Sequence, residues 1–313
     1  MKRRLSKWLK AVGAVVLLCF FIYEILRRSK KINLRSHEVL EIEKCPACFG
    51  EDLCPEFFHG TIQLKDFALW QSLFNEKNIY FGQYKGKDVV LKKLAHDKEL
   101  LNFDTKICEL ITELTQRIDN CDNTASNLRI LASLWSYGKF IDYSDLKANL
   151  PPEIETFACV KTQNLIDFLN RKHLKSEHFL TMAFVNPEPL IAMAFPYEEG
   201  WPFPKYYGAC GRFVVLEKVG VPLSHFTSVW PTKARLALQV IQMAIKMTHN
   251  DPILYLTDWS LDNFAVSNVN EVKLIDLENI ILGTIHENYK VLNFIFIFGV
   301  FKVEMGKKLK FES

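Results

Sequence analysis

Three polar residues in the C-terminal third of the 313-residue sequence have the types and the spacing that phosphoryl transfer requires. Asn263 follows Asp258 by five residues, and Asp276 follows it by 18 residues, which leaves room for one hairpin. A carboxylate can orient or accept the proton of an attacking hydroxyl, while an amide oxygen and a second carboxylate can hold magnesium ions against phosphate groups. The pattern therefore predicts Asp258 as the catalytic base and Asn263 and Asp276 as metal ligands. The alternative is a polar loop with capping carboxylates.

A lysine far upstream could supply a positive charge to the same site. Lys92 follows the apolar run Val89–Leu91, and alternation places it on the same strand face as Val90. From there its ammonium could contact the phosphates of a nucleotide, and Glu99, near the start of the following helix, would be its salt-bridge partner. The alternatives are a surface lysine on a strand and a first-turn glutamate favoured by the helix dipole.

The remaining parts of a nucleotide site are sparse. Gly82 and Gly86 would form a thin cradle for backbone contacts with phosphate. Glu217 and Val219, at the end of the strand predicted over 213–216, are candidates for hinge contacts with an adenine. The cofactor that this set of residues predicts is ATP with magnesium or manganese.

Hydrophobic periodicity predicts the elements that would position these residues. Residues 78–95 alternate like two strands joined by a turn at Lys85–Gly86, and residues 206–220 predict a second strand pair. Helices are predicted over 97–118, 162–172, 176–184 and 232–249, a turn-rich stretch over 186–204, and short strands after residue 252.

The charge is unevenly distributed along the chain. The net charge is +3, but residues 1–35 hold ten basic side chains and one acidic one, which leaves a mildly acidic body. Such a body lacks the electrostatic footprint of a nucleic-acid-binding protein. Within the basic leader, residues 11–23 are uncharged and mostly apolar. We expect a basic cytosolic tail over 1–10 and an uncleaved signal anchor over 11–26, with a cleaved signal peptide and an amphipathic N-terminus as alternatives.

The cysteine pattern predicts disulfides rather than a metal site. Cys45-Pro-Ala-Cys48 and then Cys54 follow shortly after the leader, within a predicted stalk and Cys-rich cap over 27–60. A zinc site would need a second CxxC or a His pair at proper spacing, and none is present. A disulfide framework places the body on the oxidising side of the membrane. Seven cysteines follow residue 26, so at least one has no partner within this chain.

Five segments together resemble a known family. KCPACFG, VVLKKL, EGWPFPKYYGACGR, LYLTDWSLDNFAV and VKLIDLENI are similar to segments of the divergent protein-kinase-domain family of the secretory pathway, from about residue 44 to about residue 280. The resemblance implies an α+β, two-lobed protein-kinase-like fold and residence in the ER–Golgi membrane with a lumenal body, or secretion. It also implies a secretory or extracellular protein partner. By position it assigns phosphate contact to Lys92, pairing to Glu99, the base to Asp258 and metal binding to Asn263 and Asp276.

The sequence departs from a working protein kinase at several positions. Leu256-Thr257 replaces the usual His-Arg, Ser260 stands where kinases place a lysine, and Glu278 replaces the glycine after the metal aspartate. Two functions therefore remain open. One is phosphoryl transfer from metal-ATP to a lumenal or secreted substrate. The other is a catalytically inactive pseudokinase that acts, membrane-bound or secreted, through protein contact.

The boundaries expected for a kinase-like body follow from the same motifs. Residues 61–220 would form an N-lobe with an insertion, 221–290 a partial C-lobe and 291–313 an atypical tail. Only 35 residues follow Glu278, whereas a kinase C-lobe needs roughly another hundred. The sequence therefore predicts a truncated C-lobe.

Overall fold

The fold was analysed in a computed structural model of the chain. It describes residues 33–65, 78–115, 126–129, 158–159, 171–172, 176–226 and 228–283, together with 19, 20 and 23. Most of the predicted anchor, most of the predicted helix 162–172 and the tail 291–313 lie outside these residues. Among the helices of the described part, none has the length and apolarity needed to cross a membrane.

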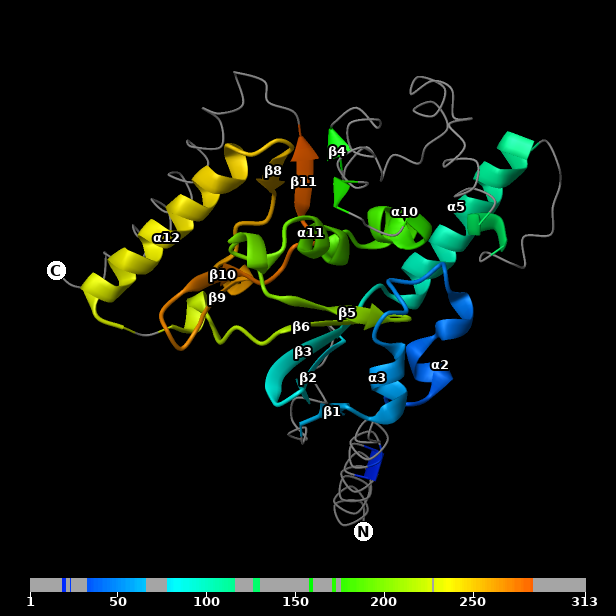
Figure 1. The fold of residues 1–313 in the computed structure, drawn as a ribbon, viewed down its shortest axis with the longest axis horizontal. Coiled ribbons are helices and arrows are strands. Elements are labelled where there is room, and N and C mark those ends of the chain that lie inside the picture. Colours follow the sequence, from blue (N-terminus) through cyan, green and yellow to red (C-terminus); the bar gives the residue numbers. More distant parts are fainter. Residues whose placement is uncertain are drawn as a thin grey trace, which may run out of the picture.

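A five-stranded antiparallel sheet forms the lower part of the molecule in Figure 1. Its strand order is β1 (Ile62–Leu64), β2 (Ile79–Tyr84), β3 (Lys87–Lys93), β6 (Phe213–Glu217) and β5 (Tyr206–Cys210). Both predicted strand pairs are confirmed. The β2–β3 turn has positive φ at Lys85 and Gly86, 49° and 74°, which matches the twist that a two-residue hairpin requires.

Both faces of this sheet are buried. Alternate residues of β6 belong to different cores: Phe213 and Val215 pack with the N-terminal segment, while Val214 and Leu216 pack with the helices on the other face. A strand that is buried on both faces has an unbroken apolar sequence. The N-terminal segment comprises α2 (His37–Leu40), a 3-10 turn η1 (Ile42–Lys44) and α3 (Cys54–His59), and the Cys54–Cys210 disulfide joins α3 to β5.

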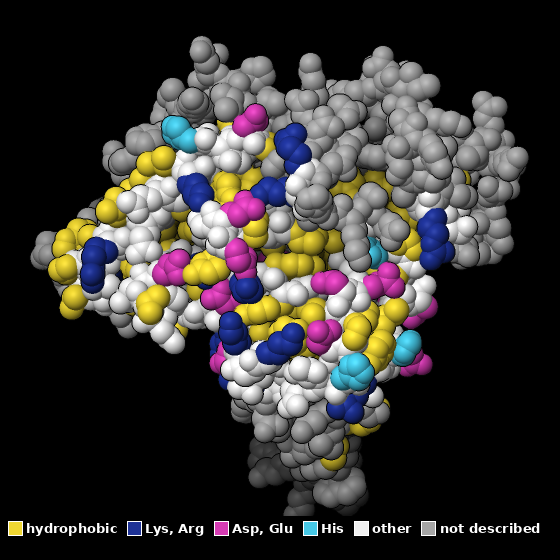
Figure 2. All heavy atoms as spheres, viewed as in Figure 1, with side chains coloured by type: hydrophobic (Ala, Val, Ile, Leu, Met, Phe, Trp, Pro, Cys, Tyr) yellow, Lys and Arg dark blue, Asp and Glu magenta, His cyan; other side chains and the backbone are white. Residues whose placement is uncertain are grey.

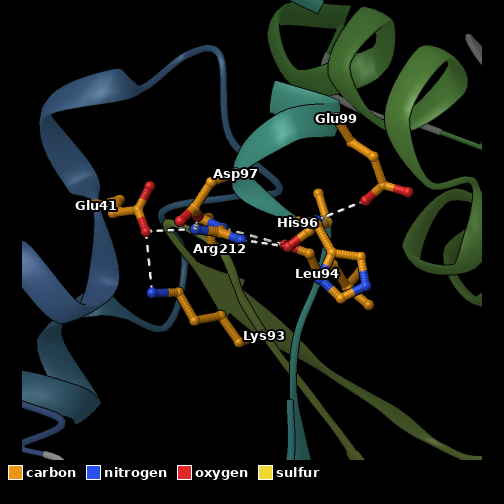
Figure 3. Close-up of polar contacts among 8 residues, drawn as sticks. Glu41, Lys93, Leu94, His96, Asp97, Glu99 and Arg212 are labelled. Atoms are coloured by element: carbon orange, nitrogen blue, oxygen red, sulfur yellow. Dashed lines mark hydrogen bonds and ion pairs between the residues drawn. The ribbon is translucent and has the colours of Figure 1, made fainter. Parts of the chain in front are cut away.

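A buried arginine attaches this segment to the start of the next helix (Figure 3). Arg212, in the β5–β6 turn, donates to the carbonyl oxygens of Leu94 and Ala95 and to the carboxylates of Glu41 and Asp97. Its side chain is only 4% exposed. The guanidinium therefore supplies hydrogen bonds to the backbone carbonyl oxygens between the end of β3 and the start of α5 (Asp97–Thr115).

Helices cover the other face of the sheet. The predictions of α5, of α10 (Ser176–Val185) and of α12 (Trp230–Thr248) are confirmed over the described residues. The residues that α12 buries recur at helical spacing: Leu236, Val240, Met243, Ala244 and Met247. Its other side carries apolar side chains to the surface, among them Trp230 and Leu238, and yellow side chains gather there in Figure 2.

The stretch 186–204 is not only turns, as the sequence analysis expected. It contains α11 (Glu188–Ala194), whose residues are nearly all buried. A helix that is buried all round shows no amphipathic period, and Pro189 lies in its first turn, where proline is tolerated. Because of these two features, hydrophobic periodicity and helix propensity do not predict α11 from the sequence.

Two small sheets complete the described fold. One has the order β10 (Val272–Leu274), β9 (Phe264–Val266) and β7 (Val221–Pro222), and the other has the order β4 (Ala158–Cys159), β11 (Ile280–Gly283) and β8 (Ile253–Leu256). In Figure 1 β9 and β10 lie beside α12, just above the five-stranded sheet, and β8, β11 and β4 lie higher, above α11. The loops that follow β8 and β10 carry the predicted catalytic and metal residues.

Candidate functional site

Lys92 lies at the centre of the candidate site. Its ammonium nitrogen is 2.6 Å from Oε1 of Glu188, in the first turn of α11, and 3.0 Å from the carbonyl oxygen of Ile275. The Lys92 side chain is 14% exposed and that of Glu188 is 1% exposed. The ion pair is therefore shielded from water, and it joins β3 to a helix 96 residues further along the chain.

The predicted partner of Lys92, Glu99, does not contact it. Glu99 lies in the first turn of α5, and its carboxylate accepts a hydrogen bond from the backbone amide of His96 (Figure 3). It therefore caps the helix start, where amides lack intrahelical partners. The prediction of a Lys92–Glu99 pair is wrong because α11, and not α5, presents its glutamate to Lys92.

Sequence reasoning missed Glu188, although a signal was present. Glu188 is the only charged residue between His178 and Tyr197. A carboxylate within an apolar run is buried at high cost unless it is paired. Such a residue therefore predicts a buried partner of opposite charge.

The site holds one lysine among three carboxylates. Burial raises the pKa of Glu188 to about 7, and although Lys92 lowers it, Asp276 and Glu278 raise it further. Burial lowers the pKa of the Lys92 ammonium, but the three carboxylates together hold that pKa above its ordinary value. The three carboxylates carry more negative charge than the Lys92 ammonium can neutralise, and this excess favours a bound cation.

Asn186 connects the Glu278 carboxylate to the backbone of Glu188. Its side-chain nitrogen donates to Oε2 of Glu278 over 2.8 Å, and its side-chain oxygen accepts from the amide of Glu188 over 3.0 Å. Burial and the neighbouring Asp276 raise the pKa of Glu278, while the hydrogen bond from Asn186 opposes them. Glu278 thus faces the same charge cluster, and Asn186, which the sequence analysis did not single out, fixes its position.

The two residues of the predicted catalytic loop, Asp258 and Asn263, are joined directly. Nδ2 of Asn263 donates to Oδ2 of Asp258 over 2.9 Å and to the backbone oxygen of Asp258 over 3.3 Å. Asn263 ends the short 3-10 turn η4 (Leu261–Asn263) and is buried. Ser260 accepts from the amide of Asp262 and caps that turn. These hydrogen bonds hold the loop in one shape.

The backbone of Ile275 connects the two halves of the site. Its carbonyl oxygen accepts from Lys92, and its amide donates to the carbonyl oxygen of Asn263 over 2.7 Å. Asp276 is the next residue, so β3, the predicted catalytic loop and the predicted metal ligand meet at one residue. Of the predicted residues, the structure brings together Lys92, Asp258, Asn263 and Asp276.

The two glycines do not join this group. Gly86 lies in the β2–β3 turn, and β3 carries Lys92 six residues away, about 20 Å along an extended strand. Gly82 lies inside β2, where a Cβ atom would come within 2.6 Å of the carbonyl oxygen of Gln63. Gly82 thus permits β1 to pair closely. The prediction that Gly86 cradles phosphate is therefore wrong. Residues 66–77, which connect β1 to β2 at the Lys92 end of the sheet, lie outside the described part.

The hinge residues are placed by a second buried lysine. Glu217 accepts from Lys273 over 2.8 Å and from the amide of Lys205 over 3.0 Å, and the Lys273 side chain is 2% exposed. The Glu217 carboxylate is therefore engaged within the protein. The backbone amide of Val219 has no hydrogen-bond partner among the described residues.

The donor set fits a nucleotide-bound divalent cation. No group of three His, Cys, Asp or Glu side chains in the described part could hold a metal ion alone. Magnesium bound with a nucleotide takes only one or two carboxylates, and phosphates and water supply the other ligands. Asp276, the amide oxygen of Asn263 and Glu278 are the available protein donors.

Comparison with known proteins gives the family. Residues 180–290 match the family model described as the protein-kinase domain of FAM69. Divergent protein kinase domain 2A of Homo sapiens is 36% identical in an alignment of 311 positions, which covers 90% of this chain and 70% of the relative. The Xenopus tropicalis protein of the same name is 32% identical in an alignment of 316 positions, with the same coverage.

The chain belongs to the divergent protein kinase domain family. A second branch is more distant: divergent protein kinase domain 2B of Mus musculus is 27% identical over 68% of this chain and 52% of the relative. In this divergent kinase domain the matched range 180–290 contains Glu188, Asp258, Asn263 and Asp276. Lys92 precedes the range, and its ion pair with Glu188 connects it to the matched part.

Proposed function

We propose that this chain binds ATP with magnesium or manganese and transfers the terminal phosphoryl group to a hydroxyl of a lumenal or secreted protein. The observation that carries the proposal is the Ile275 peptide, which holds Lys92 on one side and the Asp258–Asn263 loop on the other. Phosphoryl transfer depends mainly on positioning and on charge stabilisation. A peptide that fixes both the phosphate-binding lysine and the catalytic loop provides such positioning.

Each residue has a role in this proposal. Lys92 binds the phosphates, and Asp276 and Asn263 hold the cation, which supplies the charge that neutralises them. Asp258 orients the attacking hydroxyl and accepts its proton. The backbone of Val219 bonds the nucleobase. Glu188 keeps the Lys92 ammonium extended toward the site and does not itself touch the nucleotide.

The chemistry of the cysteines supports a secretory location. The structure contains the Cys45–Cys48 and Cys54–Cys210 disulfides, and Cys108 is also disulfide-bonded. Disulfides persist in oxidising compartments. The proposal therefore places the body in the lumen of the ER or Golgi, anchored by the N-terminal segment or released by secretion, with a secretory or extracellular protein as its partner.

A pseudokinase is the second candidate. Ser260 caps the loop and brings no positive charge to the site, whereas a lysine there would stabilise the transferred group. In this alternative the chain binds a nucleotide or none, and it acts through protein contact. The two candidates share one fold and differ in whether the protein transfers a phosphoryl group.

A thermal melt of the full chain, purified from a secretory host, tests nucleotide binding. ATP with manganese at 100 times its dissociation constant is expected to stabilise the wild type by about 2.7 kcal/mol. Asp276→Asn is expected to lose this stabilisation. Asp251→Asn, which makes the same change at an exposed position, is expected to keep it. A wild-type melting temperature that is the same with and without ATP and manganese would refute the nucleotide site.

A transfer assay then separates the two candidates. Labelled phosphate from ATP is followed into secretory proteins with the wild type and with Asp258→Asn. Transfer by the wild type that falls by at least about a hundredfold in Asp258→Asn supports the kinase, because a positioned general base contributes about that much or more. Ligand stabilisation without transfer supports the pseudokinase.

A further inference from the structure

The Cys45–Cys48 disulfide has an unusual setting for a structural crosslink. The two cysteines are only three residues apart, whereas Cys54 and Cys210 are 156 apart. A loop this short restricts the unfolded chain much less than a long one. Cys45 is partly exposed and Cys48 is 1% exposed. Cys45 is thus the more accessible of the two residues, and Cys48 is enclosed.

A buried histidine from α10 lies beside the enclosed sulfur. Nδ1 of His178 is 3.7 Å from Sγ of Cys48 and 3.1 Å from the carbonyl oxygen of Pro46. Its Nε2 is 3.7 Å from the Glu51 carboxylate. An imidazole N–H at this position can donate to a thiolate that forms at Cys48. The phosphoryl-transfer site does not use this histidine.

Other contacts hold the loop in place independently of this disulfide. The amide of Phe49 donates to the carbonyl oxygen of Gly211, and the amide of Gly211 donates to that of Gly50, both over 2.9 Å. The amide of Leu53 donates to the carbonyl oxygen of Ala209 over 3.0 Å. The loop is therefore fixed to the β5–β6 hairpin by backbone bonds, and opening Cys45–Cys48 leaves these bonds unbroken.

We propose that Cys45 and Cys48 form a thiol–disulfide exchange site for dithiols and disulfides of protein partners. A partner thiolate attacks Sγ of Cys45, the Cys45–Cys48 bond breaks, and Cys48 leaves as a thiolate that accepts a hydrogen bond from His178. The second partner thiolate attacks the partner sulfur of the mixed disulfide and releases the Cys45 thiolate. The partner loses two electrons and gains a disulfide, and both site cysteines become thiols after taking up protons. The reverse sequence reduces a partner disulfide.

Graded reduction of the full chain tests the proposal. The protein is equilibrated with increasing dithiothreitol, free thiols are alkylated, and mass spectrometry identifies which disulfides have opened. The Cys45–Cys48 disulfide is expected to open at a dithiothreitol concentration at least tenfold lower than the one that opens Cys54–Cys210. The thermal unfolding of the protein should stay cooperative when only Cys45–Cys48 is open. Opening of both disulfides at the same dithiothreitol concentration, with loss of the cooperative thermal transition, would overturn the proposal.

Three variants test the chemistry. Cys48→Ser is expected to accumulate a mixed disulfide at Cys45 with oxidised glutathione, and Cys45→Ser is expected to form none at the enclosed Cys48. His178→Leu removes the donor and is expected to slow reduction by dithiothreitol about tenfold or more, while His178→Asn, which keeps a donor, slows it less. Equal rates in the two His178 variants, or no adduct at Cys45, would contradict the mechanism. If a variant does not fold, the graded reduction of the wild type decides.

Discussion

Glu188→Gln is expected to change how the stability of the protein depends on pH. The pKa of Glu188 is about 7 in the folded protein, against an ordinary value of 4.5. Because one pKa unit corresponds to about 1.4 kcal/mol, the difference amounts to about 3 kcal/mol. The folded protein binds this proton more tightly than the unfolded chain does, so stability falls as the pH rises from 4.5 through 7, and the loss is complete above 7. Glutamine has no proton to lose and keeps an oxygen that Lys92 can donate to.

Urea denaturation from pH 4.5 to 8, followed by tryptophan fluorescence, measures this effect. The stability of the wild type relative to Glu188→Gln should fall by about 3 kcal/mol across that range. Other titrating groups are common to both proteins, so the difference isolates Glu188. Glu99→Gln is the matched control, because it keeps Glu188 and should therefore keep the fall. A wild-type-minus-variant difference that stays constant with pH would refute the charge imbalance inferred around Lys92.

Three further perturbations follow from buried contacts. Arg212→Met should lower the free energy of unfolding by about 3–5 kcal/mol in urea, because it leaves the carbonyl oxygens of Leu94 and Ala95 without their donor and Glu41 with Lys93 alone; a loss below 1 kcal/mol would contradict this. Cys54→Ser with Cys210→Ser should cost about 5 kcal/mol under non-reducing conditions, because the disulfide closes a loop of more than 150 residues; an unchanged denaturation midpoint would contradict it. Lys273→Met should cost about 3 kcal/mol, since it leaves the Glu217 carboxylate without its buried cation; adding Glu217→Gln should restore part of that loss, and a purely additive double variant would argue against the pairing.

The elements that the sequence predicted well are those set by local chemistry. The β2–β3 hairpin follows from strand alternation and from a Lys-Gly pair that accepts positive φ. The helix α12 follows from apolar residues at helical spacing. Asp258 and Asn263 belong to one loop, so their spacing of five residues places them near each other, and the structure joins them by a hydrogen bond.

The parts that the sequence did not predict depend on distant segments. Glu188 and Lys92 are 96 residues apart, and no local pattern indicates that α11 enters the site instead of α5. Gly82 and Gly86 resembled a phosphate cradle in composition, although the predicted turn at Lys85–Gly86 already puts Gly86 at the opposite end of the second strand from Lys92, as the strand register confirms. Contacts of this kind are decided by tertiary packing, which local propensity does not encode.

The role of Ile275 shows why a site can depend on a residue whose type carries no chemical signal. Ile275 contributes its peptide groups to the site, and these are the same for almost every residue type. Its amide bonds Asn263 and its carbonyl bonds Lys92, so a displacement of the strand β10 would move the catalytic loop and the lysine contact together. The side chains of Asp258, Asn263 and Lys92 can be recognised in the sequence because their functional groups are specific. The peptide that sets their separation can be recognised only in the fold.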